Sequence, residues 1–508
     1  MRKLTRSEYF RLNVVQKMLY NVLLFLYAIL TTIARIAVAA WNGVKGIGKK
    51  LKDEIMDTLA TFKNGSWQTR VSYLIMGFGS ITRGQVFRGV LFLIFEVAFV
   101  GYMIFKGAFW LDKFRTLGDV TGRYEEDPIY GEEVWIPGDN SFNILLYGLL
   151  TLLLCVLFLF IWRMNVKQNK MIEESLAKGK KLPTAKQDIR NLMDHQFHKT
   201  LLSLPLTGII CFTILPILFM ILVAFTGYDG NHNGTNNLFS WVGLQNFRNL
   251  FGGGGSSNLS YAFGKILGWT LVWAFFATFT NYFLGMFVAI LINKKGIKFK
   301  KMWRGILVLT IAIPQFVSLL YVSRLFARDG LVNGFLLKWD LVSQPVEFWA
   351  NPDYARILVI LINIWIGIPY LMLIATGILM NIPADLYESS KIDGANGFQQ
   401  FTRITMPYML FITGPYLLTS FIGNINNFNV IYLLTNGQTM GNPKLLTNGV
   451  ATTDVDLLIT WIFNITNGAN HDYKLTAVIA IMIFAVVATL SLVVYNVLPS
   501  TKNEEDFQ

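Results

Sequence analysis

The sequence predicts an all-α integral membrane protein with about eight transmembrane helices. Of its 508 residues, 53% are hydrophobic and only 15% are charged, whereas soluble domains carry about 25% charged residues. A helix needs about 20 mostly apolar residues to cross the hydrocarbon layer of a membrane. The chain has eight runs of this kind, at residues 89–105, 142–162, 201–226, 266–293, 305–323, 357–380, 408–433 and 475–498. One large membrane bundle is therefore favoured over several soluble domains.

The positive charge is distributed in a way that predicts the orientation of these spans. The net charge is +13, and a basic chain could suggest nucleic acid as a partner. However, 31 of the Lys and Arg residues fall in alternate segments, namely 1–86, 163–200, 294–304, 381–407 and 499–508. The four segments on the other side hold only 9. Because cytoplasmic loops are enriched in Lys and Arg, we expect a multi-pass protein with both termini in the cytoplasm and no nucleic-acid partner.

Residues 1–86 are expected to remain outside the bilayer core. Met18 to Ala34 is an uncharged stretch between Lys17 and Arg35, but a ninth span here would conflict with the charge distribution. We expect an amphipathic or interfacial helix, or a half-embedded hairpin. Between the spans, the acidic segment 108–141 predicts a small cap or a solvated loop, and the GGGGSSN run at 252–258 predicts a flexible linker.

Motifs for enzymatic chemistry are not convincing anywhere in the chain. The segment Gly43 to Lys50 is close to a phosphate-binding loop, but Lys50 replaces the required hydroxyl residue and no strand precedes it. The four histidines have no metal-ligand spacing. We therefore expect no catalytic residue, no metal and no cofactor. Glu96 lies inside the first apolar run, where it is either a functional acid or a structural acid that is protonated or partnered.

The cytoplasmic segment 384–407 predicts a helix, a bend and a second helix. The first helix starts near Ala384, the bend falls at Asp393 to Ala395, and the second helix continues through Ile404 before Pro407 opens the next span. Such a unit suits the docking of a soluble partner, although an ordinary amphipathic loop could have the same pattern.

The same segment resembles the E-A-A-x-x-x-G-x9-I-x-L-P loop of binding-protein-dependent ABC importers. Three residues depart from that pattern, Ser389, Ser390 and Met406, and its marked positions are matched by Glu388, Gly394, Ile404 and Pro407. The resemblance implies that the loop inserts into the ATPase subunit and couples it to the membrane helices. The coupling residues are then Glu388, Asp393, Gly394, Ala395, Ile404 and Pro407.

The resemblance extends through the later spans to the larger membrane subunit of maltose and maltodextrin importers. Its landmarks here include Tyr387-Glu388, Phe421 to Phe428 and Leu433 to Gly437. It implies a six-helix ABC permease core at 201–498 and two accessory helices within 87–200, with an N-terminal region at 1–86 and a cytoplasmic tail at 499–508. The second outside loop, about 39 residues long, lacks room for the folded domain of the Gram-negative subunit, which favours a single-membrane source.

Two spans carry polar residues at bilayer depth, where lipid would disfavour them. Ser420, Asn424 and Asn427 share one helical face, as do Asn363, Gly367 and Tyr370. Amides and hydroxyls beside an aromatic ring suit a carbohydrate, but asparagine also joins helices to one another in membranes. The resemblance favours sugar contact, and it implies a substrate site made of Ile366, Gly367, Tyr370, Ser420, Asn424 and Asn427. Asn363 and Gly423 differ from the related subunit.

The sequence is therefore interpreted as the permease subunit of an ATP-driven importer in the bacterial plasma membrane. Its substrates are expected to be maltose or maltodextrin-like oligosaccharides. The partners that the resemblance implies are a second homologous permease subunit, a pair of ATP-binding ABC subunits and an extracytoplasmic sugar-binding protein. The alternatives are an ion-coupled secondary transporter and a membrane-embedded glycosyltransferase. The first needs intramembrane acids, and the six core spans contain none; the second needs paired acids or a metal motif.

Overall fold

The computed structural model describes residue 8 and residues 13–126, 131–234, 237–253, 257–294, 296–435, 437–447 and 449–497. Parts of two segments considered above, the glycine linker at 254–256 and the C-terminal tail at 499–508, lie outside the described residues. The chain divides into two compact units, Ile36–Asn246 and a second that combines Met1–Arg35 with Phe247–Gln508. We call them the N-terminal unit and the core unit.

The N-terminal unit is built of helices and one small hairpin. Helix α2 (Val14–Asn64) begins in the residues of the core unit and continues into this one. The other elements are α3 (Trp67–Val71), α4 (Phe78–Ile81), α5 (Val86–Tyr102), the π-helical η1 (Met103–Gly107), α6 (Ala108–Phe114), β1 (Arg123–Glu126), β2 (Glu133–Ile136), α7 (Ser141–Ala177), α8 (Ala185–Met193), α9 (Phe197–Ile209), the π-helical η2 (Ile210–Ile214), α10 (Leu215–Val223) and α11 (Gln245–Leu250), which crosses the unit boundary.

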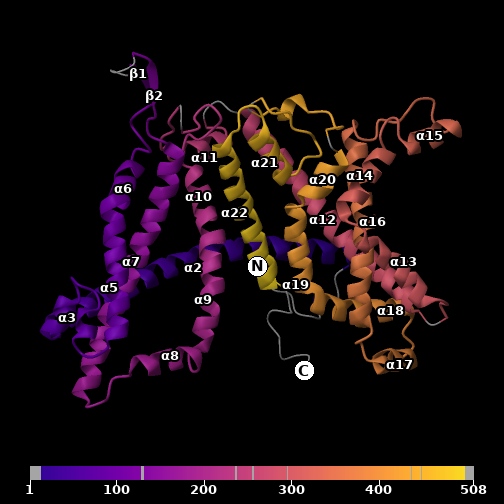
Figure 1. The fold of residues 1–508 in the computed structure, drawn as a ribbon. Helices are drawn as coiled ribbons and strands as arrows, with labels where there is room; N and C mark the ends of the chain where they lie inside the picture. Colours follow the sequence, from indigo (N-terminus) through magenta and orange to yellow (C-terminus); the bar gives the residue numbers. More distant parts are fainter. Residues whose placement is uncertain are drawn as a thin grey trace. The chain divides into compact units, whose positions relative to one another are not determined.

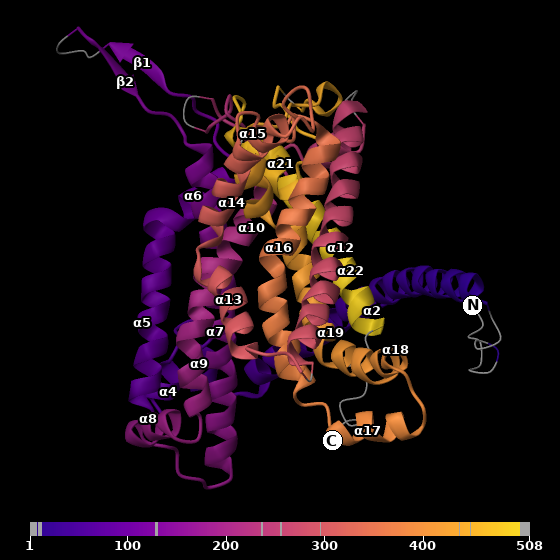
Figure 2. The same cartoon turned by 90° about the vertical axis from the view of Figure 1, so that its right-hand side faces the viewer.

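The core unit holds the remaining elements. They are α12 (Ser257–Asn293), α13 (Lys300–Ala312), α14 (Gln315–Leu325), α15 (Leu331–Lys338), α16 (Pro352–Leu379), α17 (Ala384–Ile392), α18 (Gly397–Gln400), the π-helical η3 (Phe401–Thr405), α19 (Met406–Ile425), α20 (Phe428–Thr435), the 3-10 turn η4 (Pro443–Leu445), α21 (Leu458–Asn467) and α22 (Tyr473–Val497). Within this unit, α17 and α18 lie at one end of the long helices, and α15 and α21 lie at the other (Figure 2).

The predicted membrane spans are confirmed, with one correction. Among the described residues, seven helices are long and apolar enough to cross a membrane, and a bent pair of helices makes eight. The bent pair is α13 and α14, which meet at an angle of 89°, so the run at 305–323 is not one straight span. Pro314 explains the break, because proline removes a helical hydrogen bond and disfavours helical geometry at the residue before it. Ile313 is accordingly extended, with ψ of 126°.

The segment preceding the first span is one long helix. A half-embedded hairpin at residues 18–34 is therefore wrong, because α2 runs unbroken from Val14 to Asn64. Its later part is fastened to α7 by ion pairs: Arg163 contacts Glu54 at 2.7 Å and Asp57 at 2.6 Å, and Lys170 contacts Asp57 at 2.5 Å. The segment Gly43 to Lys50, which only partly matches a phosphate-binding loop, lies inside this helix.

A two-stranded hairpin in the acidic segment 108–141 was not predicted. Strands β1 and β2 pair antiparallel, with Arg123 opposite Ile136, and they project beyond the ends of α6 and α7 (Figure 1). Asp139 closes the base of the hairpin by accepting hydrogen bonds from the backbone N–H groups of Asp119 and Val120. Burial would raise the pKa of Asp139, but these bonds and Lys113 outweigh it and hold the pKa below its usual value.

The centre of the core unit is the contact of α12 with α16 and α19. Its buried side chains are Tyr282, Met286, Ala289, Ile292, Leu371, Met372, Ala375 and Met409. Gly285 allows α12 and α16 to approach closely, because a Cβ atom there would lie 2.5 Å from the Cβ of Leu371. The hydroxyl of Tyr282 bonds to Thr413 on α19 at 2.8 Å. This packing fixes the positions of α16 and α19, which carry the predicted site residues.

Candidate functional site

The segment 384–407 folds largely as the sequence predicts. Helix α17 begins at Ala384 and ends at Ile392, and Gly394 follows it with φ of +79°. The N–H of Gly394 bonds to the carbonyl of Lys391, and the N–H of Ala395 bonds to that of Ser390. This pair of bonds is the Schellman end of a helix, in which the residue after the cap adopts the left-handed conformation that glycine tolerates best. The bend is therefore built around Gly394.

The second helix of this segment is not separate from the span that follows it. Helix α18, the π-helical turn η3 and α19 form one continuous helical stretch from Gly397 to Ile425. Pro407 is the second residue of α19, a position where a missing N–H costs little because η3 already departs from α-helical bonding. Ile404 lies in η3 and is half-buried. The expectation that Pro407 opens a new helix is therefore wrong in detail.

Internal bonds hold α17 against the following helix. The hydroxyl of Tyr387 lies 2.9 Å from that of Thr405, and the amide of Gln400 donates to the hydroxyl of Ser390 at 2.9 Å. Glu388, Asp393 and Gly394 in the same segment are exposed. The loop is thus held together by hydrogen bonds and has an exposed outer surface.

That outer surface carries apolar side chains that water disfavours. Ile392 is 87% exposed and Phe398 is 74% exposed, and both flank the bend at Gly394. Glu388 also lines a cleft of about 450 Å³, which extends to Asn293 and Lys294 at the end of α12. Exposed apolar side chains on a projecting segment are typical of a protein-docking surface.

Two predicted substrate residues on α16 line a second cavity. Ile366 and Tyr370 face a space of about 320 Å³ that reaches the break between α13 and α14 at Pro314. Tyr370 is 52% exposed, so its ring and hydroxyl are available to a ligand. Gly367 instead faces α12, where an added Cβ atom would lie 2.3 Å from the amide nitrogen of Asn281. Gly367 therefore allows close helix packing.

The predicted residues on α19 are engaged with neighbouring groups. The side-chain amide of Asn424 donates to the hydroxyl of Thr278 on α12 at 3.0 Å. Its oxygen accepts from Asn427 at 3.4 Å, and the oxygen of Asn427 accepts from the backbone N–H of Val430 at 3.3 Å. In this structure, Asn424 thus links two helices, as the helix-joining interpretation requires.

A tyrosine brings the residues of α16 and α19 into one neighbourhood. The ring of Tyr416 lies 6.4 Å from that of Tyr370 between centroids, and its hydroxyl interacts with Ser420 one turn further along α19. Asn363 does not share this neighbourhood. It is buried against α12, where its backbone carbonyl accepts from Asn281 at 3.4 Å. The structure therefore brings Tyr370 and Ser420 together through Tyr416.

Glu96, the acid in the first span, has a structural contact. Its carboxylate accepts the backbone N–H of Met76 at 2.8 Å, and Met76 is fully buried. An acid that satisfies a buried backbone donor stabilises the local fold. This contact favours the structural interpretation over a functional one.

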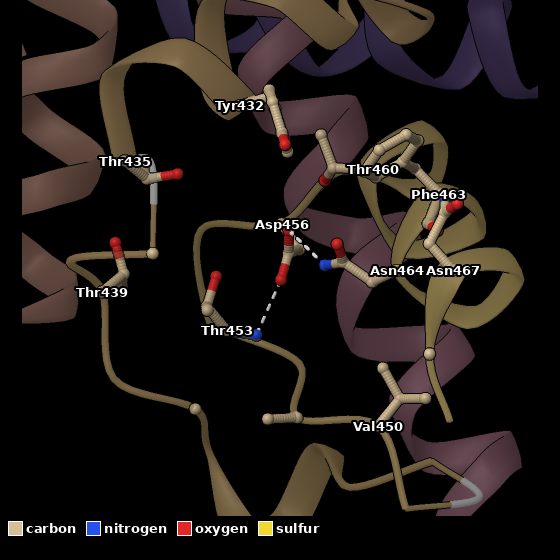
Figure 3. A pocket seen from close by; sticks show the side chains of 14 residues that line it. Tyr432, Thr435, Thr439, Val450, Thr453, Asp456, Thr460, Phe463, Asn464 and Asn467 are labelled. Atoms are coloured by element: carbon tan, nitrogen blue, oxygen red, sulfur yellow. Dashed lines mark hydrogen bonds between the residues drawn. The ribbon is translucent and has the colours of Figure 1, made fainter. Parts of the chain in front are cut away.

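Sequence reasoning missed a third cavity, at the end of the core unit opposite α17. It has a volume of about 550 Å³ and lies between α20, α21 and the segment that joins them. Its lining includes Asp456, whose carboxylate accepts the backbone N–H of Thr453 at 2.7 Å and the amide of Asn464 at 3.4 Å (Figure 3). Burial raises the pKa of the Asp456 carboxyl. The one signal for this cavity in the sequence is the clustering of Thr, Asn and Asp residues between two apolar spans.

The fold and these sites define a helical membrane protein with a projecting helix-bend-helix segment at residues 384–407. Residues 281–502 match the protein family described as the binding-protein-dependent transport system inner membrane component. The maltodextrin transport system permease protein MalC of Streptococcus pneumoniae is 31% identical over 440 residues, which cover 85% of this chain and 96% of that protein. The chain therefore belongs to this family of importer permeases.

Two further relatives extend this comparison. The maltodextrin transport system permease protein MdxF of Bacillus subtilis is 31% identical over 439 residues, covering 85% of this chain and 95% of that protein. The galactooligosaccharides transport system permease protein GanP of the same species is 30% identical over 434 residues, covering 85% and 97%. All three relatives are transport components, so the protein is a membrane permease of the ABC sugar-importer class.

Proposed function

We propose that this chain forms part of the translocation path of an ATP-driven importer for maltose or maltodextrin-like oligosaccharides. The observation that carries the proposal is the relation along 85% of the chain to permeases of maltodextrin systems. The similar relation to a galactooligosaccharide permease makes neutral oligosaccharides the shared substrate chemistry. The landmarks Tyr387-Glu388 and Phe421 to Phe428 favour maltodextrins within that class.

The cytoplasmic loop is proposed to couple ATP hydrolysis to the membrane helices. Its outer surface presents Glu388, Ile392 and Phe398 to a partner. Because η3 continues without interruption into α19, a displacement of the loop is transmitted directly to the helix that carries Ser420, Asn424 and Asn427. The bend at Gly394, with Asp393 and Ala395 beside it, keeps α17 at a fixed angle for that partner. Ile404 and Pro407 form the junction with α19.

The proposed assembly includes four kinds of partner. A pair of ABC subunits supplies ATP hydrolysis, a second homologous permease completes the path, an extracytoplasmic protein delivers the sugar, and the bilayer surrounds the spans. We propose that both termini and the loop 384–407 are cytoplasmic, because basic residues gather on that side. The proposed organisation is an N-terminal region at 1–86, two accessory helices within 87–200, a permease core at 201–498 and a tail at 499–508.

The proposed sugar site consists of Ile366, Tyr370, Ser420, Asn424 and Asn427, together with Gly367, which acts on the site through the close packing of α16 against α12. Tyr370 offers an exposed ring for stacking, and Ser420 lies near it through Tyr416. Asn424 and Asn427 bond to each other and to the protein, so a sugar must exchange with these bonds.

Alanine at Tyr370 or Asn424 tests this site against a purely helix-joining role. Loss of one neutral hydrogen bond costs about 0.5–1.5 kcal/mol, which is about 2- to 13-fold in affinity. We expect Asn424→Ala to raise the KM of oligosaccharide uptake by that factor, and Tyr370→Ala, which also removes the stacking ring, to raise it by at least as much. Both variants should give normal complex yield after mild detergent extraction. Thr278→Ala is the matched control, because it removes the interhelical bond of Asn424 without removing the amide.

The outcomes of this experiment separate the two roles. If Asn424 binds sugar, Thr278→Ala keeps the KM within about twofold of wild type. If Asn424 only joins α12 to α19, both Asn424→Ala and Thr278→Ala lower the yield of assembled complex, and uptake per assembled complex is unchanged. The second result would contradict the proposed site while leaving the family assignment intact.

A further inference from the structure

The cavity between α20 and α21 has the composition of a carbohydrate site. Figure 3 shows Thr435 and Thr439 on one side and Phe463, Asn464 and Asn467 on the other, with Asp456 between them. At about 550 Å³, it falls within the range of about 300–1,000 Å³ that ligand pockets occupy. Hydroxyl and amide groups supply hydrogen bonds in several directions, which is what the hydroxyls of a sugar need.

Aromatic rings form one wall of the cavity. Tyr432 on α20 and Phe463 on α21 meet edge to face with centroids 5.2 Å apart, and Phe428 lies 4.7 Å and 4.9 Å from these two rings. An apolar ring face provides a surface for the C–H face of a hexose, which polar side chains alone cannot provide. The combination is more specific for carbohydrate than either component.

One buried hydroxyl in the lining lacks a hydrogen-bond partner among the described residues. Thr439 is only 7% exposed, and among the described residues its hydroxyl has no hydrogen-bond partner. A buried hydroxyl without a partner costs about 1–3 kcal/mol, so each such group calls for a physical explanation. A ligand hydroxyl in the cavity would satisfy it.

The charge of the lining selects a neutral ligand. Among the lining residues that the structure describes, Asp456 is the acid and no Lys, Arg or His accompanies it, so an anion is disfavoured. The described residues also contain no cluster of three acidic, His or Cys side chains suited to a metal ion. Asp456 orients Asn464 and the turn at Thr453 through its hydrogen bonds. It is therefore a positioning residue for the amide beside it.

The residues that line the cavity also follow those of the proposed translocation path closely in the sequence. Asn427 is the residue before α20 begins at Phe428, and Tyr432 lies five residues further on. The cavity is at the end of the core unit opposite the loop 384–407 (Figure 2). On the proposed orientation, that end is extracytoplasmic, where the sugar arrives.

We propose that this cavity is an entry subsite that holds the trailing units of a neutral oligosaccharide whose leading units contact Asn424 and Asn427. The proposal rests on the proposed function and extends it to chain-length selectivity. A short sugar occupies the path alone, whereas a longer one also reaches the cavity. Affinity for long chains therefore depends on both places, and affinity for a disaccharide depends on one.

The test uses the complete importer in proteoliposomes, with maltose and maltohexaose as probes. Thr439→Val and Asn467→Ala should each raise the KM for maltohexaose by about 2- to 13-fold and leave the KM for maltose within about twofold. Thr439→Val should not lower complex yield or thermal stability, because it removes a hydroxyl that has no partner among the described residues. Asn470→Ala, an exposed asparagine beyond the cavity lining, is the control and should change neither KM.

Other results overturn the entry subsite in distinguishable ways. Unchanged KM values for both sugars would exclude sugar contact in the cavity. An equal loss for both sugars, with weaker stimulation of ATP hydrolysis by the binding protein, would mean that a protein loop occupies the cavity. In either case Asn424→Ala still lowers uptake of both sugars if the proposed function is correct. If Asn424→Ala has no effect on either sugar, the proposed path itself is wrong.

Discussion

Replacing Gly394 with valine should abolish sugar-stimulated ATP hydrolysis while the complex still assembles in the membrane. Gly394 has φ of +79°, and for a residue with a side chain this region costs about 1–2 kcal/mol, more when the residue is β-branched. Nothing lies within 4 Å of an added Cβ atom, so the penalty is in the backbone and not in a collision. The Schellman end of α17 should therefore open, and the docking surface should lose its shape.

A second substitution at the same position separates backbone geometry from bulk. Asparagine tolerates the left-handed conformation better than other residues with a side chain, so Gly394→Asn should keep most of the stimulation. ATP hydrolysis by the reconstituted complex, with and without sugar-loaded binding protein, is the measurement. Wild-type stimulation in Gly394→Val would contradict the coupling role of the bend, as would equal loss in both variants.

Removal of Glu173 should destabilise the N-terminal unit by about 3–5 kcal/mol, because it leaves a buried charge without its partner. The side chain of Arg83 is 7% exposed and contacts the Glu173 carboxylate at 2.7 Å. The same carboxylate accepts the hydroxyl of Thr69 at 2.7 Å and the backbone N–H of Ser66 at 2.8 Å. In Glu173→Ala all three donors lose this acceptor at once.

The neighbouring acid provides the control for this prediction. Glu174 is exposed, so Glu174→Ala should change stability by no more than about 0.5 kcal/mol. The melting temperature of the purified complex and the protease resistance of residues 36–246 report the difference. The double variant Arg83→Leu with Glu173→Leu should recover much of the loss, because replacement of a buried ion pair by apolar residues is often neutral. Equal melting of the two single alanine variants would contradict the account of this network.

The sequence predicted the spans and the helix-bend-helix shape of the segment 384–407 because both depend on local patterns. Runs of apolar residues define membrane helices by length, and the bend follows from a glycine after a short helix. The sharp bend at Pro314 could not be predicted from the sequence. The angle to which a proline bends a helix depends on the neighbours of α13 and α14. The long continuous helix α2 was missed because its stabilising partners, Arg163 and Lys170, lie more than a hundred residues away.

The candidate sugar site was predictable in part. The spacing of Ser420, Asn424 and Asn427 placed them on one face, but it did not show that Asn424 bonds to Thr278 or that Tyr416 connects Tyr370 with Ser420. Side-chain partners on different helices are set by packing, and periodicity does not encode them. The cavity at Thr439 and Asn467 is formed by α20, α21 and an irregular segment, so no single stretch of sequence predicts it.

Uptake of labelled maltohexaose into proteoliposomes tests the central claim most directly. The vesicles contain this chain with its partner permease and ATPase pair, and the sugar-binding protein is added outside. We predict accumulation that requires both ATP at the cytoplasmic face and the binding protein, and that persists when proton and sodium gradients are dissipated. Accumulation that is driven by an ion gradient without ATP, or that is equally fast without the binding protein, would contradict the assignment as an ATP-driven importer permease.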